Sequence, residues 1–129
     1  HGVRFVDDSK GTNVGATLAA VEGMTEPLVV IAGGDGKGQD FAPLASAFRG
    51  KVRLAVLIGR DRERLAAALA GACPVEFATD MDAAVVAAAR AARPGDLVLL
   101  SPACASLDMF RDYAARGDAF AAAAQRLDA

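Results

Sequence analysis

The chain has 129 residues, is 53% hydrophobic and 23% charged, and carries a formal net charge of −2, which fits a single domain with its own core. The near balance of charge excludes a nucleic-acid binder that works through bulk charge, because neutralising phosphates takes a clustered excess of Lys and Arg. The apolar content excludes a disordered chain.

Cysteine content and hydropathy indicate a cytoplasmic protein. Cys73 and Cys104 are the only two cysteines, too few for a disulfide framework, and they suit a reducing compartment. Charges interrupt the apolar runs well short of the roughly 20 residues that span a bilayer, and no signal-peptide pattern follows His1. We therefore expect no membrane insertion. The chain begins without Met, which indicates a piece of a longer chain or a trimmed form of one.

Short β-branched or Leu-rich runs alternate with Ala-rich runs along the whole chain, in which 31 residues are Ala. The apolar runs predict strands at 3–6, 28–32, 52–58, 75–78 and 97–100. The Ala-rich runs predict helices at 13–23, 41–48, 61–71, 80–92 and 108–126. This alternation predicts an α/β, Rossmann-like fold with a mostly parallel sheet of five or six strands flanked by helices.

Capping residues refine the predicted helices. Asp61 and Asp80 are expected N-caps, and Gly71 is an expected C-cap. Pro94-Gly95 predicts a firm stop after the fourth helix. Gly117-Asp118 predicts a break in the last helix, with the Asp capping its second part.

Ligands of parallel α/β sheets bind at the carboxyl ends of the strands, which selects the segments that follow each strand. Two strand exits, at 59–61 and 79–80, look like ordinary caps. Three others are polar and contain Gly or Ser, and in a parallel sheet they share one edge: 7–13, 33–38 and 101–106.

The glycine-rich segment 33–38 matches neither of the two common phosphate-binding motifs. A Walker A loop needs Gly four residues before its Gly-Lys pair, where this chain has Ile31, and Ser or Thr after the Lys, where it has Gly38. The dinucleotide fingerprint fails because Gln39 stands at the place of its third glycine. The segment is either a flexible ligand loop or a plain turn.

Lys10 and Lys37 stand on neighbouring loops of the expected ligand edge. With Thr12, Asn13 and Ser106 beside them, they predict an anion site, since helix N-termini add unpaired N–H groups and partial positive charge. The alternative is that both lysines are solvated surface charges and that the hydroxyl and amide groups are caps.

Nucleophilic and metal chemistry have little support in this sequence. Cys104 has no histidine partner, because the only histidine is His1, so a buried structural thiol is the favoured interpretation. One His and two scattered Cys exclude an ordinary structural zinc site, and we expect no metal site in this chain. The aspartates of the loops, Asp7, Asp8 and Asp35, either help hold Mg²⁺ with a nucleotide or only cap and turn.

The same three loops carry a resemblance to a known family. They read Asp8-Ser9-Lys10-Gly11-Thr12-Asn13, Gly33-Gly34-Asp35-Gly36-Lys37 and Ser101-Pro102-Ala103-Cys104-Ala105-Ser106-Leu107-Asp108. In order and spacing these motifs resemble the C-terminal domain of the D-glutamate-adding Mur ligases of peptidoglycan synthesis. The similarity extends over nearly the whole chain, including Gly59-Arg60-Asp61 and Arg116-Gly117. Residues 1–129 would then form that one domain, without the N-terminal UDP-binding and central ATPase domains.

The resemblance implies a role for each loop. Lys37 and Thr12 would hold one carboxylate of D-glutamate, and Ser106 with Leu107 the other. Tyr113 stands where the family has another aromatic residue lining the pocket. Asp8 would approach the nucleotide ribose, with Lys10 near the phosphates or substrate. The remaining residues would shape the loops rather than bind ligand: Gly33, Gly34, Asp35, Gly36 and Asn13.

The resemblance also implies cofactors and partners. ATP and Mg²⁺ would be bound mainly by the absent central domain, and UDP-N-acetylmuramoyl-L-alanine by the absent domains, so no activity is expected from the chain alone. We expect D-glutamate as the ligand of this chain, a monomer, and no nucleic-acid partner. Two alternatives remain open: a stand-alone module for a small anion or mononucleotide without catalysis, and a purely structural domain.

Overall fold

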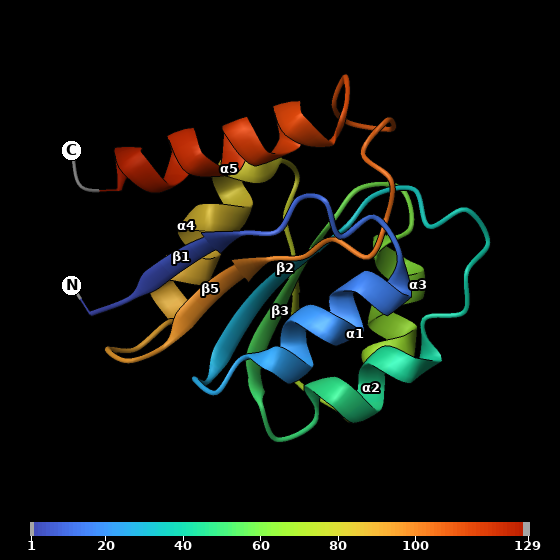
Figure 1. Cartoon of the computed structure of the whole chain (residues 1–129), viewed down its shortest axis with the longest axis horizontal. Coiled ribbons are helices and arrows are strands. Elements are labelled where there is room, and N and C mark those ends of the chain that lie inside the picture. The colour runs from blue at the N-terminus through green and yellow to red at the C-terminus, as the bar shows by residue number, and fades with distance from the viewer. Residues whose placement is uncertain (1, 128–129) are drawn as a thin grey trace.

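Five parallel strands form one sheet in the computed structural model, which describes residues 2–127 (Figure 1). The strands are β1 (Arg4–Asp7), β2 (Leu28–Gly33), β3 (Val52–Ile58), β4 (Val75–Phe77) and β5 (Leu97–Leu100). Their order across the sheet is β1-β5-β2-β3-β4, and every pair is parallel. The predicted α/β class and parallel sheet are confirmed.

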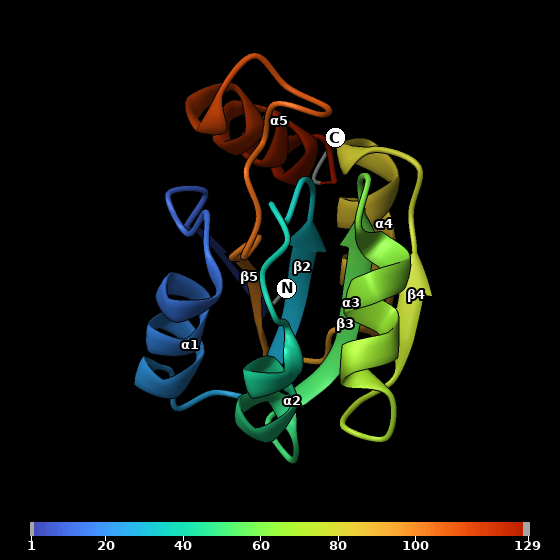
Figure 2. The ribbon, with the colours of Figure 1, turned by 90° about the vertical axis from the view of Figure 1, so that its right-hand side faces the viewer.

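Helices cover both faces of the sheet (Figure 2). The helices are α1 (Val14–Gly23), α2 (Ala42–Phe48), α3 (Arg62–Leu69), α4 (Met81–Ala91) and α5 (Tyr113–Arg126). The first three pack on one face and the last two on the other, which gives two separate apolar clusters on either side of the strands. None of these helices, within the described residues, is long and apolar enough to cross a membrane.

The two central strands are buried along their whole length. Every residue of β2 and of β5 is buried, because each strand has a neighbour on both sides and helices above and below. This explains why Val29-Val30-Ile31 and Leu97-Val98-Leu99-Leu100 are apolar on both faces of the sheet. The edge strands β1 and β4 keep partly exposed positions.

The last helix differs from the prediction. It begins at Tyr113 rather than near residue 108, since the Asp112 carboxylate accepts from the Ala115 N–H at 2.8 Å and caps it. It also runs through Gly117-Asp118 without a break. A Cβ on Gly117 would lie 2.6 Å from Asp7 Oδ2, so this glycine serves the close approach of α5 to the end of β1.

The other helix ends follow the sequence more closely. Asp80 caps α4 as predicted, accepting from the Ala83 N–H at 2.8 Å. Gly71 has φ +80° just after α3, as expected of a glycine that ends a helix. Asp61 stands at the N-cap of α3 as predicted, but its side chain makes no capping hydrogen bond there.

Strand order places three loops together at the carboxyl edge of the sheet. β5 lies between β1 and β2, while the helices that follow β2 and β5 cover opposite faces. Such a reversal opens a crevice at the carboxyl ends of the strands. We call the segments there the β1 loop, the β2 loop and the β5 loop, which are residues 8–13, 34–41 and 101–112.

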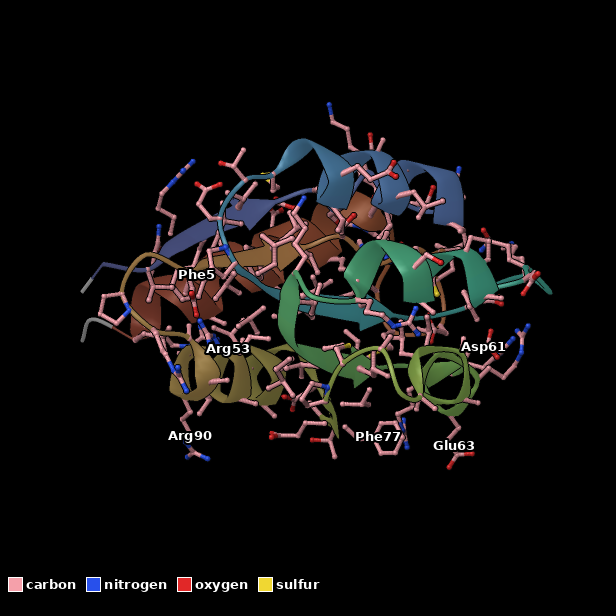
Figure 3. All side chains as sticks on the ribbon, turned by 90° about the horizontal axis from the view of Figure 1, so that it is seen from below. Phe5, Arg53, Asp61, Glu63, Phe77 and Arg90 are labelled. Atoms are coloured by element: carbon pink, nitrogen blue, oxygen red, sulfur yellow. The ribbon has the colours of Figure 1, made fainter. Side chains whose placement is uncertain are left out.

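An ion pair lies at the amino ends of the strands, opposite the three loops. Arg53 at the start of β3 donates to both oxygens of Asp96, at 2.7 and 3.0 Å, and Asp96 also accepts from the Arg93 N–H at 2.8 Å. Figure 3 shows Arg53 and Asp61 at opposite ends of the sheet. The hydrogen bond from Arg53 lowers the pKa of the Asp96 carboxyl below its ordinary value.

This ion pair predicts a pH-dependent loss of stability. Because the pKa of Asp96 is lower in the folded chain than in the unfolded chain, its stabilisation is present at neutral pH and lost as the pH falls through the folded value. Asp96→Asn should therefore lower the melting temperature near neutral pH, with the difference from the parent chain shrinking below about pH 4. Melting curves of both chains across the acidic range test this, and a difference independent of pH would contradict it.

Candidate functional site

Backbone hydrogen bonds tie the three loops to one another. Asp35 in the β2 loop and Ala105 in the β5 loop exchange N–H···O bonds of 3.0 and 2.8 Å, forming an antiparallel bridge. The Ala103 N–H donates to the Gly11 carbonyl oxygen at 2.9 Å, which joins the β5 loop to the β1 loop. The expectation that the three polar loops share one edge is confirmed.

Two glycines let the β2 loop cross its neighbours at close range. Gly33 and Gly34 have φ values of +128° and +131°, which side chains rarely tolerate. A Cβ on Gly33 would lie 1.9 Å from the Ile58 carbonyl oxygen, and one on Gly34 would lie 2.4 Å from that of Ala105. The segment thus needs glycine for its path between β3 and the β5 loop, and its role as a ligand loop stays a prediction.

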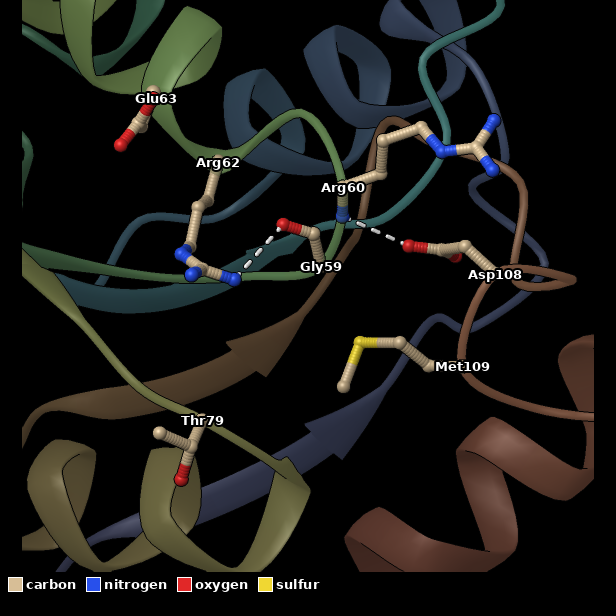
Figure 4. Close-up of a pocket in the computed structure, with 7 residues that line it drawn as sticks. All are labelled: Gly59, Arg60, Arg62, Glu63, Thr79, Asp108 and Met109. Atoms are coloured by element: carbon tan, nitrogen blue, oxygen red, sulfur yellow. Dashed lines mark hydrogen bonds between the residues drawn. The ribbon is translucent and has the colours of Figure 1, made fainter.

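The segment that follows β3 forms hydrogen bonds with the β2 loop, although the sequence predicted only an ordinary helix cap there. Asp61 Oδ2 accepts from the Gly36 N–H at 2.7 Å, and the Asp61 N–H donates to the Gly34 carbonyl oxygen at 3.0 Å. The Arg60 N–H donates to Asp108 Oδ2 of the β5 loop at 2.9 Å (Figure 4). The one sequence signal for these hydrogen bonds was the inclusion of Gly59-Arg60-Asp61 in the family resemblance.

Lys37 projects from the tip of the β2 loop. It is exposed, has φ +53°, and its N–H donates to Asp35 Oδ1 at 3.0 Å. Within residues 2–127 its ammonium group forms no ion pair, so the charge is available to an anion. The predicted loop-shaping role of Asp35 agrees with this local hydrogen bond and with its bridge to Ala105.

The β1 loop presents Lys10, Thr12 and Asn13. Asn13 caps α1, with its Oδ1 accepting from the Ala16 N–H at 2.8 Å, while Thr12 is half-buried just before it. Lys10 is exposed and borders a pocket of about 220 Å³ that Tyr113 also lines. The structure therefore groups Lys10 with Tyr113 in a pocket that does not include Lys37.

The Asp8 carboxylate is hydrogen-bonded to Ser101, the first residue of the β5 loop. The Ser101 hydroxyl lies 3.0 Å from Asp8 Oδ2 and 3.0 Å from the Thr17 hydroxyl. Thr17 and Ser101 are fully buried. This chain of hydroxyl groups orients one carboxylate oxygen of Asp8 inward.

The β5 loop carries Ser106 and Leu107. Ser106 does not cap α5, which begins seven residues later; its carbonyl oxygen accepts from Met109 and Phe110 in a tight turn. Its side chain is buried, and its hydroxyl has no protein partner among the described residues. Leu107 is 67% exposed and Tyr113 is 48% exposed.

A buried arginine, which the sequence did not single out as a site residue, joins α5 to these loops. The Arg116 guanidinium is 1% exposed and donates to Ser9 Oγ, to the Ser9 carbonyl oxygen and to the Cys104 carbonyl oxygen, at 2.9, 2.7 and 2.9 Å. Burial lowers its pKa below the ordinary value. It links the turn that carries Lys10 to the segment that leads to Ser106.

Cys104 is a structural thiol, as predicted. Its side chain is fully buried, and burial raises the pKa of the thiol to about 12. The thiolate that nucleophilic chemistry requires is therefore scarce at neutral pH. Within residues 2–127, no three His, Cys, Asp or Glu side chains gather as metal ligands.

The burial of Cys104 predicts selective protection from alkylation. In the folded chain, iodoacetamide near pH 8 should modify the half-buried Cys73 faster than Cys104, because both access and thiolate fraction are smaller at Cys104. Peptide mass mapping after timed labelling measures the two rates, and denaturant should equalise them. Faster labelling of Cys104 in the folded chain would contradict the assignment.

A larger pocket of about 530 Å³ lies beside the loops, at the ends of β3 and β4 (Figure 4). Its lining includes Arg60, Arg62, Thr79 and Met109. None of the residues predicted to bind a ligand lines it. The predicted carboxylate-binding groups instead stand on the three hydrogen-bonded loops.

Comparison with known proteins decides the family. The model of the Mur ligase, glutamate ligase domain matches residues 1–104. The chain belongs to the Mur ligase family. It is 65% identical over 127 residues to a UDP-N-acetylmuramoylalanine–D-glutamate ligase of Aromatoleum aromaticum, covering 98% of this chain and 27% of that protein. The corresponding ligase of Burkholderia vietnamiensis is 57% identical over 126 residues, covering 97% and 25%.

The chain thus spans about a quarter of the length of these curated relatives. Among solved structures, a domain from Haemophilus ducreyi described as a UDP-N-acetylmuramate:L-alanyl-gamma-D-glutamyl-medo-diaminopimelate ligase superposes with a TM-score of 0.61. That match covers 98% of this chain and 89% of the other, at 16% identity. It supports the shared Mur ligase fold, whereas the roles of individual site residues stay predictions.

Proposed function

We propose that this Mur ligase domain binds D-glutamate on its three loops and delivers it to a ligase reaction. The observation that carries the proposal is the junction of the β1, β2 and β5 loops, which brings the groups predicted to bind the two carboxylates onto one hydrogen-bonded assembly. The exposed ammonium of Lys37 and the hydroxyl of Ser106 are both without partners among the described residues. A small dianion needs two such separated donor sites.

Each binding group would have one task. Lys37 and Thr12 would bind one carboxylate of D-glutamate, and Ser106 and Leu107 the other, with Tyr113 lining the pocket. Fixing both carboxylates leaves the amine as the free end of the ligand, oriented for attack. Gly33, Gly34 and Gly36 would give the β2 loop the path that presents Lys37.

The full-length ligase would complete the reaction. ATP with Mg²⁺, held mainly outside this chain, would supply the phosphoryl group that activates the carboxylate of UDP-N-acetylmuramoyl-L-alanine. The amine of D-glutamate would then form the amide bond as phosphate leaves. Asp8, which is partly buried, and the exposed Lys10 would face the nucleotide from the β1 loop. We place this reaction in the cytoplasm, in a monomer, where it would serve peptidoglycan synthesis and with it cell shape and division.

A first test removes the charge of Lys37. The assay uses a chimera in which this chain replaces the matching quarter of the Aromatoleum aromaticum relative. Lys37→Ala should raise the KM for D-glutamate about ten- to a hundredfold and leave that for ATP nearly unchanged, because a hydrogen bond to a charged group contributes about 1.5–3 kcal/mol. The matched control is Arg90→Ala, which removes an exposed cation from α4 (Figure 3). Equal KM values for D-glutamate in both variants would contradict the proposal.

A second test removes the hydroxyl of Ser106. In the same chimera, Ser106→Ala should narrow the preference for D-glutamate over D-alanine, because only D-glutamate has the carboxylate that Ser106 would bind. The melting temperature should change little, since Ser106 caps no helix. An intact preference would remove Ser106 from the site. Equal binding of inorganic phosphate and D-glutamate by the chain would instead favour an anion-binding module without catalysis.

A further inference from the structure

One side chain joins the β2 loop to the β5 loop and to the start of α1. Gln39, in the β2 loop, donates from Nε2 to the carbonyl oxygens of Gly36 and Ala103, at 2.8 and 3.0 Å. Its Oε1 accepts from the N–H of Val14, at 2.8 Å. Val14 is the first residue of α1 and directly follows the β1 loop, whereas Ala103 belongs to the β5 loop. Through its side chain, Gln39 thus joins the β2 and β5 loops to the helix that directly follows the β1 loop.

The chemistry of the three partners demands a primary amide. Two partners are carbonyl oxygens, which need donors, and the third is an N–H group, which needs an acceptor. The amide of Gln39 supplies both kinds of group within one rigid plane. A carboxylate at the same place would keep the acceptor for Val14 but lose both donors. The partners also fix which end of the amide is oxygen and which is nitrogen.

The position of Gln39 between the loops suggests what it does for the ligand. Thr12 stands two residues before Val14, and Lys37 lies between Gly36 and Gln39. On the third loop, Ser106 follows Ala103 by three residues. We propose that Gln39 is a positioning residue that sets the separation of the two carboxylate-binding sites, and thereby the length of dicarboxylate that the domain accepts. This inference rests on the proposed function.

Other contacts should keep the loops folded when the amide is lost. The backbone bridge between Asp35 and Ala105 joins the β2 and β5 loops independently of Gln39. The bond from the Ala103 N–H to the Gly11 carbonyl oxygen does the same for the β1 and β5 loops. Substitution of Gln39 should therefore loosen the spacing of the loops without unfolding the domain.

The test compares ligands of different length. In the chimera described above, we expect Gln39→Met, which has similar length and no amide, to lower the kcat/KM preference for D-glutamate over D-aspartate about tenfold, because small misplacements of bound groups are costly in a preorganised site. Gln39→Glu should lower it as well. The control is Asp80→Ala, which removes the N-cap of α4 on the opposite face and should lower the melting temperature with the preference intact.

A second measurement tests the contacts between the loops independently of enzyme activity. Hydrogen exchange of the Val14 amide in the isolated chain should speed up in Gln39→Met and stay slow in Asp80→Ala, because only the first substitution removes its acceptor. Faster Val14 exchange in Gln39→Met together with an unchanged ligand preference in both Gln39 variants would overturn the inference. Unchanged Val14 exchange in Gln39→Met would overturn it as well. The proposed function itself has a separate test. If the unmutated chimera folds but shows no D-glutamate-dependent ligase activity, while the parent ligase is active in the same assay, the proposed function is overturned.

Discussion

The pairing of β5 between β1 and β2 is the constraint on which the rest of this domain depends. β2 and β5 pair in parallel from Leu28 with Leu97 to Ile31 with Leu100, and all these residues are fully buried. Because the chain returns to the middle of the sheet only with its fifth strand, segments about 70 to 90 residues apart emerge side by side. The proposed site would depend on that return, because its predicted residues lie on three separate loops.

Close approach of backbones carries this constraint from the sheet to the loops. Gly33 and Gly34 lie so near the Ile58 and Ala105 carbonyl oxygens that a Cβ at either would clash. The β2 loop is therefore fixed against β3 and the β5 loop before any side chain of the site contributes. Asp61 and Gln39 then satisfy the polar groups of that crossing, which would otherwise be costly to bury.

Local sequence patterns predicted the alternation of elements, since buried strands and Ala-rich helices have strong signatures. Local patterns failed to predict the helix start where several aspartates were equally good candidates for the N-cap. The sequence pattern placed the start of the last helix at Asp108 and a second cap at Asp118, but only Asp112 caps α5. Asp108 is engaged by the Arg60 N–H, a contact across 48 residues. The long-range contacts of Gln39 and Asp61 could not be predicted for the same reason, because their partners are close only in the folded chain.

The acidic residues around the β2 loop explain how the Lys37 ammonium can stay without an ion pair among the described residues. Asp35 accepts from the Lys37 N–H and lies 3.6 Å from the Arg60 guanidinium, and Asp61 accepts from the Gly36 N–H. Both carboxylates thus accept from backbone N–H groups, Asp35 also lies near Arg60, and neither forms an ion pair with Lys37 among the described residues. The loop can carry several carboxylates and still present a positive group to an anion. The arrangement of the charges, rather than their count, would let a chain of net charge −2 offer the proposed anion site.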